Sequence, residues 1–298
     1  MLQRVAEHAC RLLPSAYRFP VERRMRGYFE HLRLERADVV CVSFGKSGRT
    51  WLRVMISRVY QRKYRLAEGS LLEFDNFHRS RSGIPSVLFT HDNYLRDYTR
   101  DGGGKAAFRN KRVMLLVRHP ADVAVSVFNH WKHRMRPHKA LLNGYPATDD
   151  DVSPYEFLMR PCGLDKVIAF MNEWGAAIDE LDQGLLVRYE DLRSRTATEL
   201  ARVMSFLGVD PSTEEIEEAV EYAAFENMQR RESQSQSSSD RLRATDLSNP
   251  DSFKTRRGKV GGYQDDFSEA EVEAIERHVN ATLRERFGYC EREAAFGN

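Results

Sequence analysis

The sequence has few cysteines and no long hydrophobic run. Its four cysteines stand far apart among 298 residues, and no two of them form a CxxC pair. That spacing is typical of a chain in a reducing compartment and argues against a zinc site or a disulfide framework. No apolar stretch reaches the length of about 18 residues that a membrane span needs. Residues 1–36 mix arginine and glutamate into their apolar stretches, which differs from a secretory signal. We therefore expect a cytoplasmic protein without a membrane span.

A strong charge of either sign is also absent. The chain has 46 lysines and arginines against 44 aspartates and glutamates, which gives a net charge of +2. This balance gives no reason to expect nucleic acid as a partner. Basic residues do gather locally, in HWKHRMRPHK (130–139) and KTRRGK (254–259). Each cluster predicts either a site for an anionic ligand or a solvated helix face.

The sequence does contain an alternation of strand-length and helical patterns. Apolar runs rich in valine and leucine predict buried parallel strands at 38–44, 86–91, 112–118 and 184–190. Helical periodicity follows Thr50 and Pro120, and further helices are expected near 165–182, 192–207, 212–228 and 268–286. The pattern predicts the α/β class, as a three-layer fold with a central parallel sheet that helices cover on both faces.

The domain organisation follows from changes of composition along the chain. We expect a single domain over 38–298 and an N-terminal helical segment over 1–37 that packs on it. That segment is arginine-rich and amphipathic, so weak contact with an acidic membrane surface is the alternative. Residues 231–255 are polar and serine-rich, a composition that does not bury enough apolar surface to order itself. We expect them to form a mobile loop that acts as a lid.

The stretch VVCVSFGKSGRTWL (39–52) places Gly-Lys-Ser between a predicted strand and a predicted helix. Free backbone N–H groups and the positive end of the helix dipole meet there, which makes a P-loop-like site for phosphate or sulfate. Two features of an ATP-binding P-loop are missing. Val40 stands where the first glycine would be, and the next apolar strand ends in Arg118 instead of a magnesium-binding aspartate. An arginine binds a second phosphate but no magnesium ion.

These residues together resemble the sulfotransferase family that uses 3'-phosphoadenosine 5'-phosphosulfate (PAPS). The resemblance spans most of the chain after residue 38 and rests on five motifs in the family's order: GKSGRTWL (45–52), VRHPADVAVS (117–126), RYEDL (188–192), FENM (225–228) and RRGKVGGY (256–263). It implies an enzyme that moves the sulfuryl group from PAPS to a hydroxyl or amine and leaves 3'-phosphoadenosine 5'-phosphate (PAP). No metal ion would be required. The acceptor is expected to be a glycan or another small metabolite, and the basic stretch at 130–139 indicates an acidic one, such as a glycan or a phosphorylated lipid.

The resemblance also implies the residues of the site. Those that would bind PAPS are Lys46, Ser47, Gly48, Arg49, Thr50, Trp51, Arg118, Ser126, Tyr189, Phe225, Met228, Arg256, Arg257 and Gly258. Lys46 would stabilise the negative charge that builds on the oxygen bridging to the departing 5'-phosphate. His91 would take the proton of the acceptor, with Asp92 as the alternative base. Trp51 and Phe225 either stack on adenine or fill the core, because both tasks need the same aromatic surface.

Two residues depart from the family's pattern. Arg49 replaces a threonine of the first loop and adds a donor near the sulfonate or the acceptor. Phe89 replaces the lysine of a Lys-Thr-His motif, so stabilisation of the sulfonate depends more on Lys46. Two other functions stay open: a small-molecule kinase with an atypical P-loop, and a catalytically inactive nucleotide-binding relative. His130 and His133 lie three apart on a predicted helix, but no third metal ligand follows at a suitable spacing.

Overall fold

The computed structural model describes residues 6–7, 10, 12–100, 105–148, 150–233 and 258–290. Its central sheet consists of the strands β1 (Val39–Ser43), β2 (Val87–Thr90), β3 (Arg112–Val117) and β4 (Gln183–Arg188). The strands are all parallel and follow the order β2-β1-β3-β4. Each of the four strands expected from the sequence is present, with its ends within one or two residues of the prediction.

The helices lie between and after the strands. In chain order they are α2 (Ser15–Arg36), α3 (Arg49–Tyr64), α4 (Asn76–Ser80), α5 (Leu95–Thr99), α6 (Pro120–His133), α7 (Pro137–Leu142), α8 (Pro154–Met159), α9 (Leu164–Ala177), α10 (Tyr189–Ser194), α11 (Thr196–Phe206), α12 (Thr213–Tyr222), α13 (Phe225–Ser233) and α14 (Glu269–Thr282). Short 3-10 turns are η1 (Ala106–Phe108), η2 (Ile178–Glu180), η5 (Gly262–Asp266) and η6 (Glu285–Phe287).

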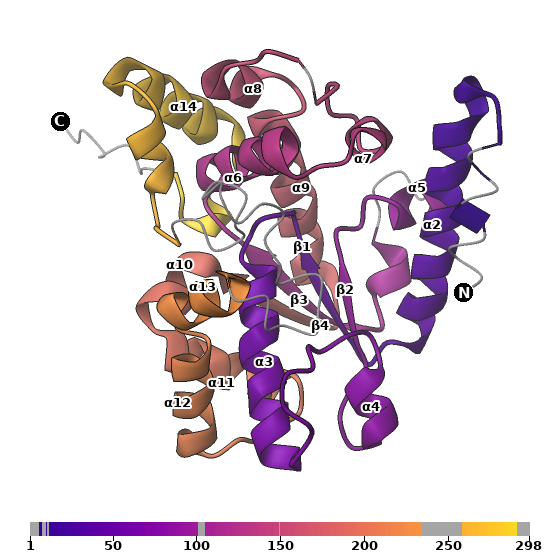
Figure 1. Ribbon diagram of the computed structural model, residues 1–298, viewed down its shortest axis with the longest axis vertical. Coiled ribbons are helices and arrows are strands. Elements are labelled where there is room, and N and C mark those ends of the chain that lie inside the picture. The colour runs from indigo at the N-terminus through magenta and orange to yellow at the C-terminus, as the bar shows by residue number, and fades with distance from the viewer. Residues whose placement is uncertain are drawn as a thin grey trace.

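Two hydrophobic clusters lie on opposite faces of the sheet. Val39 and Cys41 of β1 belong to the cluster that α3, α11 and α12 cover, whereas Val40 and Val42 belong to the cluster that α6, α9 and α14 cover. This alternation is that of a strand buried on both faces. Figure 1 shows the helices arranged around the sheet in this way. The predicted α/β class with a central parallel sheet is confirmed.

Several predicted helix boundaries were wrong. The helix expected at 212–228 is divided between α12 and α13, and the one at 192–207 between α10 and α11. Hydrophobic periodicity continues across each break, so it could not locate the ends. Residues 231–233, which were expected to belong to the loop at 231–255, form the last turn of α13. There the Glu232 side chain is buried and pairs with Arg134, the residue after α6, at 3.7 Å. The rest of that predicted lid lies outside the described residues.

Helix α2 packs along the β2 side of the molecule, next to α5 (Figure 1). Arg23 pairs with Asp97 of α5 and donates to the carbonyl oxygen of Leu142 at 2.6 Å. Leu34 near the end of α2 is 1% exposed and belongs to the core. The N-terminal segment therefore packs against the rest of the chain, and the domain boundary at residue 37 stays a prediction. Within the described part of the chain, no helix is long and apolar enough to cross a membrane.

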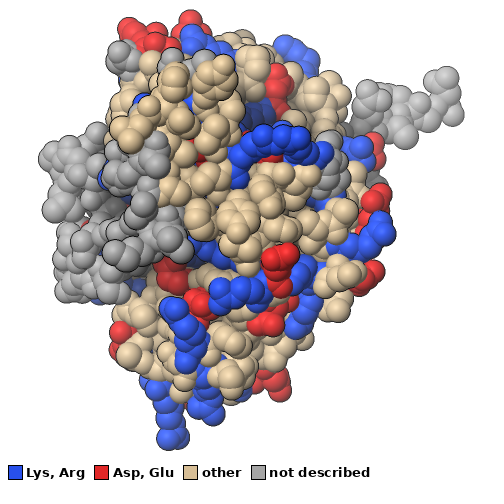
Figure 2. Space-filling view, turned by 90° about the vertical axis from the view of Figure 1, so that its right-hand side faces the viewer, with Lys and Arg blue, Asp and Glu red and all other residues tan. Residues whose placement is uncertain are grey.

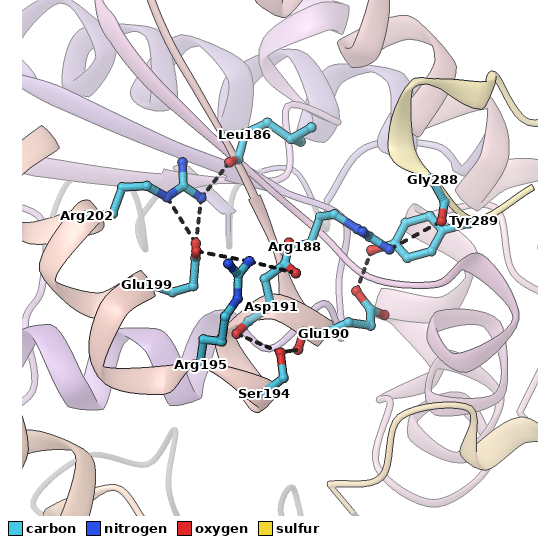
Figure 3. A network of polar contacts seen from close by, with 10 residues as sticks. All are labelled: Leu186, Arg188, Glu190, Asp191, Ser194, Arg195, Glu199, Arg202, Gly288 and Tyr289. Atoms are coloured by element: carbon cyan, nitrogen blue, oxygen red, sulfur yellow. Dashed lines mark hydrogen bonds and ion pairs between the residues drawn. The ribbon is translucent and has the colours of Figure 1, made fainter.

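A polar network fixes the junction of β4 and α10 (Figure 3). The Glu190 carboxylate accepts hydrogen bonds from the Tyr289 hydroxyl at 2.5 Å and from the backbone N–H of His119 at 2.9 Å. The Arg188 guanidinium lies over the Tyr289 ring, 4.6 Å from its centroid. The network joins β4, the turn after β3 and the C-terminal segment. It thereby holds Tyr189, between Arg188 and Glu190, at the carboxyl ends of the strands.

Candidate active site

A cavity of about 880 Å³ opens at the carboxyl ends of the strands, where parallel α/β sheets bind their ligands. The predicted site residues that line it are Lys46, Gly48, Arg49, Thr50, Trp51, His91, Arg118, Ser126, Tyr189, Phe225, Met228 and Gly258. Ser47 is 2% exposed and is not among the residues that line it. Arg256 and Arg257 lie outside the described residues. The structure thus brings the predicted positions together, while their individual roles stay predictions.

The loop between β1 and α3 has a conformation suited to an anion. Lys46 and Gly48 both have positive φ angles, of 74° and 93°, and this curls the chain before the first turn of α3. Among the described residues, no side chain caps the N-terminus of α3. Gly48 packs so closely on Tyr189 that an added Cβ would lie 2.5 Å from the ring. The first N–H groups of α3 are donors of the kind that bind an anion at a helix N-terminus.

Arg118 stands at the end of β3 and supplies a second cationic position. Its guanidinium donates to the carbonyl oxygen of Lys259 at 3.0 Å, pairs with Asp122 at 3.2 Å and lies 4.6 Å from the centre of the Tyr189 ring. Asp122 also accepts from the backbone N–H of Tyr263 at 3.0 Å. The Nε of Arg118 is buried without a hydrogen-bond partner among the described residues. Such a donor is costly unless a ligand satisfies it.

Aromatic side chains form the wall between these two cationic positions. Trp51 donates from its indole N–H to the carbonyl oxygen of Ala223 at 2.8 Å and packs edge-on against Tyr189. Phe225 packs against Gly258, where an added Cβ would lie 2.8 Å from the ring. Trp51 and Phe225 are each partly exposed and line the cavity. This placement favours stacking on a base over filling the core.

His91 follows β2 and is held through both ring nitrogens. Nδ1 lies 2.7 Å from the carbonyl oxygen of Ser43, so Nδ1 carries the proton and donates it. Nε2 lies 2.7 Å from a guanidinium nitrogen of Arg49, so Nε2 accepts through its lone pair. Arg49 also donates to the carbonyl oxygen of Thr90 at 2.9 Å. Both contacts require a neutral imidazole with its lone pair on Nε2, which is the form that can act as a base.

Asp92, the alternative base, is engaged differently. The buried Lys105 ammonium contacts the Asp92 carboxylate at 2.7 Å and the Glu173 carboxylate at 2.5 Å. Lys105 also lies 4.8 Å from the centre of the Trp174 ring, and its side chain is 3% exposed. A carboxylate paired with a buried ammonium is a weaker proton acceptor than an unpaired one, because the ammonium stabilises its charged form. The arrangement favours His91 over Asp92 as the base.

Phe89 does not face the cavity. It lies on the sheet face covered by α3, opposite Cys41 in the β1–β2 register. The Arg53 guanidinium stacks over its ring at 3.9 Å, and Arg53 is 4% exposed. Position 89 therefore supplies a hydrophobic platform for a buried arginine and no cation to the site.

Part of the basic cluster at 130–139 lines the same cavity. Its members in the lining are His130, Arg134, Arg136 and Lys139. His138 instead contacts Glu22 of α2 at 2.7 Å. No group of three or more His, Cys, Asp or Glu side chains in the described ranges is arranged to hold a metal ion. Some residues of this cluster therefore line the cavity, whereas His138 packs α7 against α2.

Lys166 of α9 lines the cavity as well, and it contacts Asn143, a neighbour of Lys139. It donates to the carbonyl oxygen of Asn143 and lies 4.1 Å from the centre of the Tyr145 ring. Burial lowers the pKa of Lys166 to about 8, and the nearby Arg23 acts in the same direction. Burial also lowers the pKa of Lys139. Two partly desolvated ammonium groups at one end of a cavity form a site that gains from an anionic group.

Overall the lining is strongly basic. It contains eleven lysine and arginine side chains against four carboxylates: Asp92, Asp122, Glu173 and Glu232. Each of those carboxylates already pairs with a cation. On the face that Figure 2 shows, by contrast, basic and acidic side chains are interspersed. The cavity lining therefore carries a surplus of positive charge that this face does not show.

Sequence reasoning missed several residues of this site. Lys105 and Glu173 are far apart in the chain, so no local motif could connect them. Glu30 accepts from the Thr90 hydroxyl beside the site, and burial raises its pKa. Lys166 and Arg193 also line the cavity. Arg193 directly follows the RYEDL motif, so its position next to a motif could have identified it. The other missed residues have no such signal in the sequence.

The fold and the cavity define an α/β protein with a P-loop-like anion site at the carboxyl ends of its strands. The sulfotransferase domain family matches residues 36–287, so the chain belongs to the sulfotransferase family and is an enzyme of that class. Cytosolic sulfotransferase 12 from Arabidopsis thaliana is 24% identical over 274 residues, which cover 84% of this chain and 77% of the plant protein.

Solved structures show the same fold. Mouse sulfotransferase SULT7A1 complexed with PAP has a TM-score of 0.54 at 18% identity, covering 86% of this chain and 90% of the mouse chain. Retinol dehydratase in complex with androsterone and the inactive cofactor PAP has a TM-score of 0.55 at 16% identity, covering 83% of this chain and 81% of that chain.

Proposed function

We propose that this sulfotransferase uses PAPS as the donor and transfers its sulfuryl group to a hydroxyl or amine of a negatively charged acceptor in the cytoplasm. The observation that supports this proposal most is that one cavity contains two positions for an anion. They are the N-terminus of α3, which has no side-chain cap among the described residues, and Arg118 at the end of β3. Aromatic rings lie between them. A nucleotide with phosphates at both its 5' and 3' positions needs this combination.

The donor would occupy the cavity as follows. The 5'-phosphosulfate would bind at Lys46 and the first N–H groups of α3, and the adenine between Trp51 and Phe225. The 3'-phosphate would bind at Arg118 and Ser126, which both line the cavity. The resemblance to structures that contain PAP supports this assignment.

The reaction is an in-line displacement at sulfur. The acceptor oxygen or nitrogen forms a bond to sulfur while the bond from sulfur to the bridging oxygen of the 5'-phosphate breaks. The electron pair of that bond leaves with PAP. Lys46 stabilises the negative charge on the bridging oxygen, which is larger in the transition state than in the ground state. The lone pair of His91 Nε2 takes the proton of the acceptor.

The acceptor end supports the choice of a charged acceptor. Lys139 and Lys166 line it, and burial lowers the pKa of both. Desolvated ammonium groups bind a carboxylate, sulfate or phosphate more favourably than a neutral group. A glycan or small metabolite with an acidic group beside its hydroxyl or amine meets this requirement.

The donor assignment is tested by thermal unfolding. PAP should raise the melting temperature in a metal-free buffer, because a ligand that binds only the folded chain stabilises it by mass action. ATP with magnesium should do so less, since it has no 3'-phosphate for Arg118. Each charge-assisted hydrogen bond contributes about 1.5–3 kcal/mol, so Arg118→Ala should remove most of the effect of PAP. Arg195→Ala, at an exposed arginine outside the cavity, is the control. Greater stabilisation by magnesium ATP than by PAP would support the kinase alternative.

A further inference from the structure

We propose that Arg49 is a second cation for the transferring sulfuryl group, and that it reaches this group by leaving His91. Donor binding would then uncover the base. This inference rests on the proposed function, and it concerns Arg49, whose residue type departs from the family's usual loop sequence. It explains the contact between Arg49 and His91 Nε2, which is otherwise hard to reconcile with catalysis. The Nε2 lone pair that should accept the proton of the acceptor is occupied by this contact.

The contact with His91 is well defined. One Arg49 nitrogen lies 2.7 Å from His91 Nε2, and another donates to the Thr90 carbonyl oxygen at 2.9 Å. Since His91 Nδ1 donates to the Ser43 carbonyl oxygen, Nε2 is the only ring nitrogen with a lone pair. Arg49 thus keeps the imidazole neutral and correctly oriented, but it also blocks that lone pair.

Arg49 lies where it can exchange this contact for the sulfonate. It is the first residue of α3, directly after the Lys46–Gly48 turn that would hold the 5'-phosphosulfate. The His91 ring is next to the same turn, since an added Cβ on Gly45 would lie 3.9 Å from its Cε1. A change of side-chain rotamer is therefore enough to move the guanidinium from an uncharged partner to an anion. A contact between the guanidinium and an anion is stronger than one between the guanidinium and an uncharged ring, because both partners carry charge.

The other arginines of α3 cannot take this role. Arg53 is stacked over Phe89 on the sheet face that α3 covers, away from the cavity, and Arg58 pairs with Glu218. Of the arginines of α3, Arg49 is the one that lines the cavity. With a phenylalanine at position 89, Arg49 also supplies the positive charge that β2 does not provide.

The exchange fits the balance of the reaction. Once the sulfonate attracts Arg49, His91 Nε2 is free to accept the acceptor proton as the new bond to sulfur forms and the bond to the bridging oxygen breaks. The guanidinium then stabilises the charge on the sulfonate oxygens, while Lys46 stabilises the charge on the leaving oxygen. The base is exposed only when a donor is present.

The test compares PAPS with PAP, which differ by the sulfonate that Arg49 is proposed to bind. Isothermal titration of each nucleotide, without acceptor, is carried out on the wild type and on Arg49→Met. We expect the dissociation constant of PAPS to rise about 10-fold or more, and that of PAP to change by less than about 3-fold. Arg62→Met removes a half-exposed arginine from the other end of the same helix and should change neither.

The possible outcomes separate the two proposals. If the wild type does not bind PAP, the proposed donor is wrong. If PAP binds and Arg49→Met weakens PAPS and PAP equally, Arg49 is a phosphate ligand and this inference fails. It fails as well if neither constant changes. Arg118→Ala should weaken both nucleotides alike, which shows that the assay detects contacts common to them.

A spectroscopic measurement tests the exchange itself. In protein with ¹⁵N-labelled histidine, the Nε2 resonance of His91 should shift when PAPS is added and stay in place when PAP is added. In Arg49→Met the two nucleotides should have the same effect. Arg49→Lys should keep part of the preference for PAPS, because an ammonium binds the sulfonate without spanning Thr90 and His91. An Nε2 resonance unaffected by PAPS in the wild type would refute the exchange.

Discussion

Lys46 holds a left-handed backbone conformation, with φ of 74°. This conformation costs a non-glycine residue about 1–2 kcal/mol, and strain of this kind is concentrated at functional sites. A lysine retained at such a position indicates that its side chain has a task that glycine could not perform. Its neighbours Gly45 and Gly48 show that glycine is otherwise accepted in this turn.

Replacing Lys46 by alanine should therefore lower turnover by about 10²–10³-fold, because a donor at the developing charge is lost. Lys46→Gly should lower turnover equally while relieving the backbone strain, so its free energy of unfolding should be no lower than that of the alanine variant. Turnover with radiolabelled donor and urea unfolding measure the two effects. Lys63→Ala, at the far end of α3, is the control. Turnover close to that of the wild type in Lys46→Ala would exclude the catalytic role.

Lys166 should make stability depend on pH in an identifiable window. Burial lowers its pKa to about 8, whereas an unfolded lysine has a pKa of about 10.4. Below pH 8 both states are charged and the folded state bears the cost of burying the ammonium. As pH rises above 8, the folded state loses the proton first, so the free energy of unfolding should rise relative to that of Lys166→Met. Urea unfolding from pH 7 to pH 10 measures the difference, and parallel curves for the two proteins would contradict it.

At the scale of elements, each functional residue follows a strand or begins a helix. The loop before α3, the residue after β2, the end of β3 and the start of α10 supply Lys46, His91, Arg118 and Tyr189. Parallel strands place these four ends at one edge of the sheet, so residues distant in sequence meet. The strands themselves were predicted to within one or two residues. Helix ends were less predictable, as the division between α12 and α13 shows, because apolar periodicity does not stop where a helix does.

Gly48 links two of these elements, and its neighbour Tyr189 makes the link testable. Gly48→Ala should reduce the affinity for PAP by 10-fold or more and destabilise the fold, because the new Cβ would lie 2.5 Å from the Tyr189 ring. Gly69→Ala is a matched control: Gly69 also has a positive φ, of 83°, but has nothing within 4 Å of an added Cβ. Gly69→Ala should lower the free energy of unfolding only by the cost of the left-handed backbone, about 1–2 kcal/mol, and it should bind PAP as the wild type does. Equal affinities in the two variants would show that the contact is unimportant.

At the scale of the whole molecule, the N-terminal helix is part of the site's framework. Glu30 of α2 accepts from Thr90, the residue whose carbonyl oxygen holds Arg49. Arg23 of α2 lines the cavity and contacts both Asp97 and the backbone of Asn93. The helical segment and the domain after it were expected to be separate parts of the chain. In the structure, α2 packs against the site and supplies one residue of the cavity lining.

Two leucines of α2 test this integration. Leu34 is 1% exposed within the core, whereas Leu32, on the same helix, is 37% exposed. Leu34→Ala should lower the free energy of unfolding by about 2–5 kcal/mol, as the loss of a buried side chain does. Leu32→Ala should lower it by less than about 0.5 kcal/mol. Chemical denaturation measures both. A single transition whose midpoint does not respond to Leu34→Ala would mean that α2 is not part of the cooperative unit.

The sequence by itself determined the fold class and the anion loop, because both depend on local order: apolar runs of strand length, and a glycine-rich turn between a strand and a helix. Only the tertiary structure decided which side chains meet. The pairing of Asp92 with Lys105, the position of Phe89 under Arg53 and the contact of Arg49 with His91 each join separate elements. Such contacts depend on strand register and helix packing. Their energies come from burial and partner geometry, which no local pattern records.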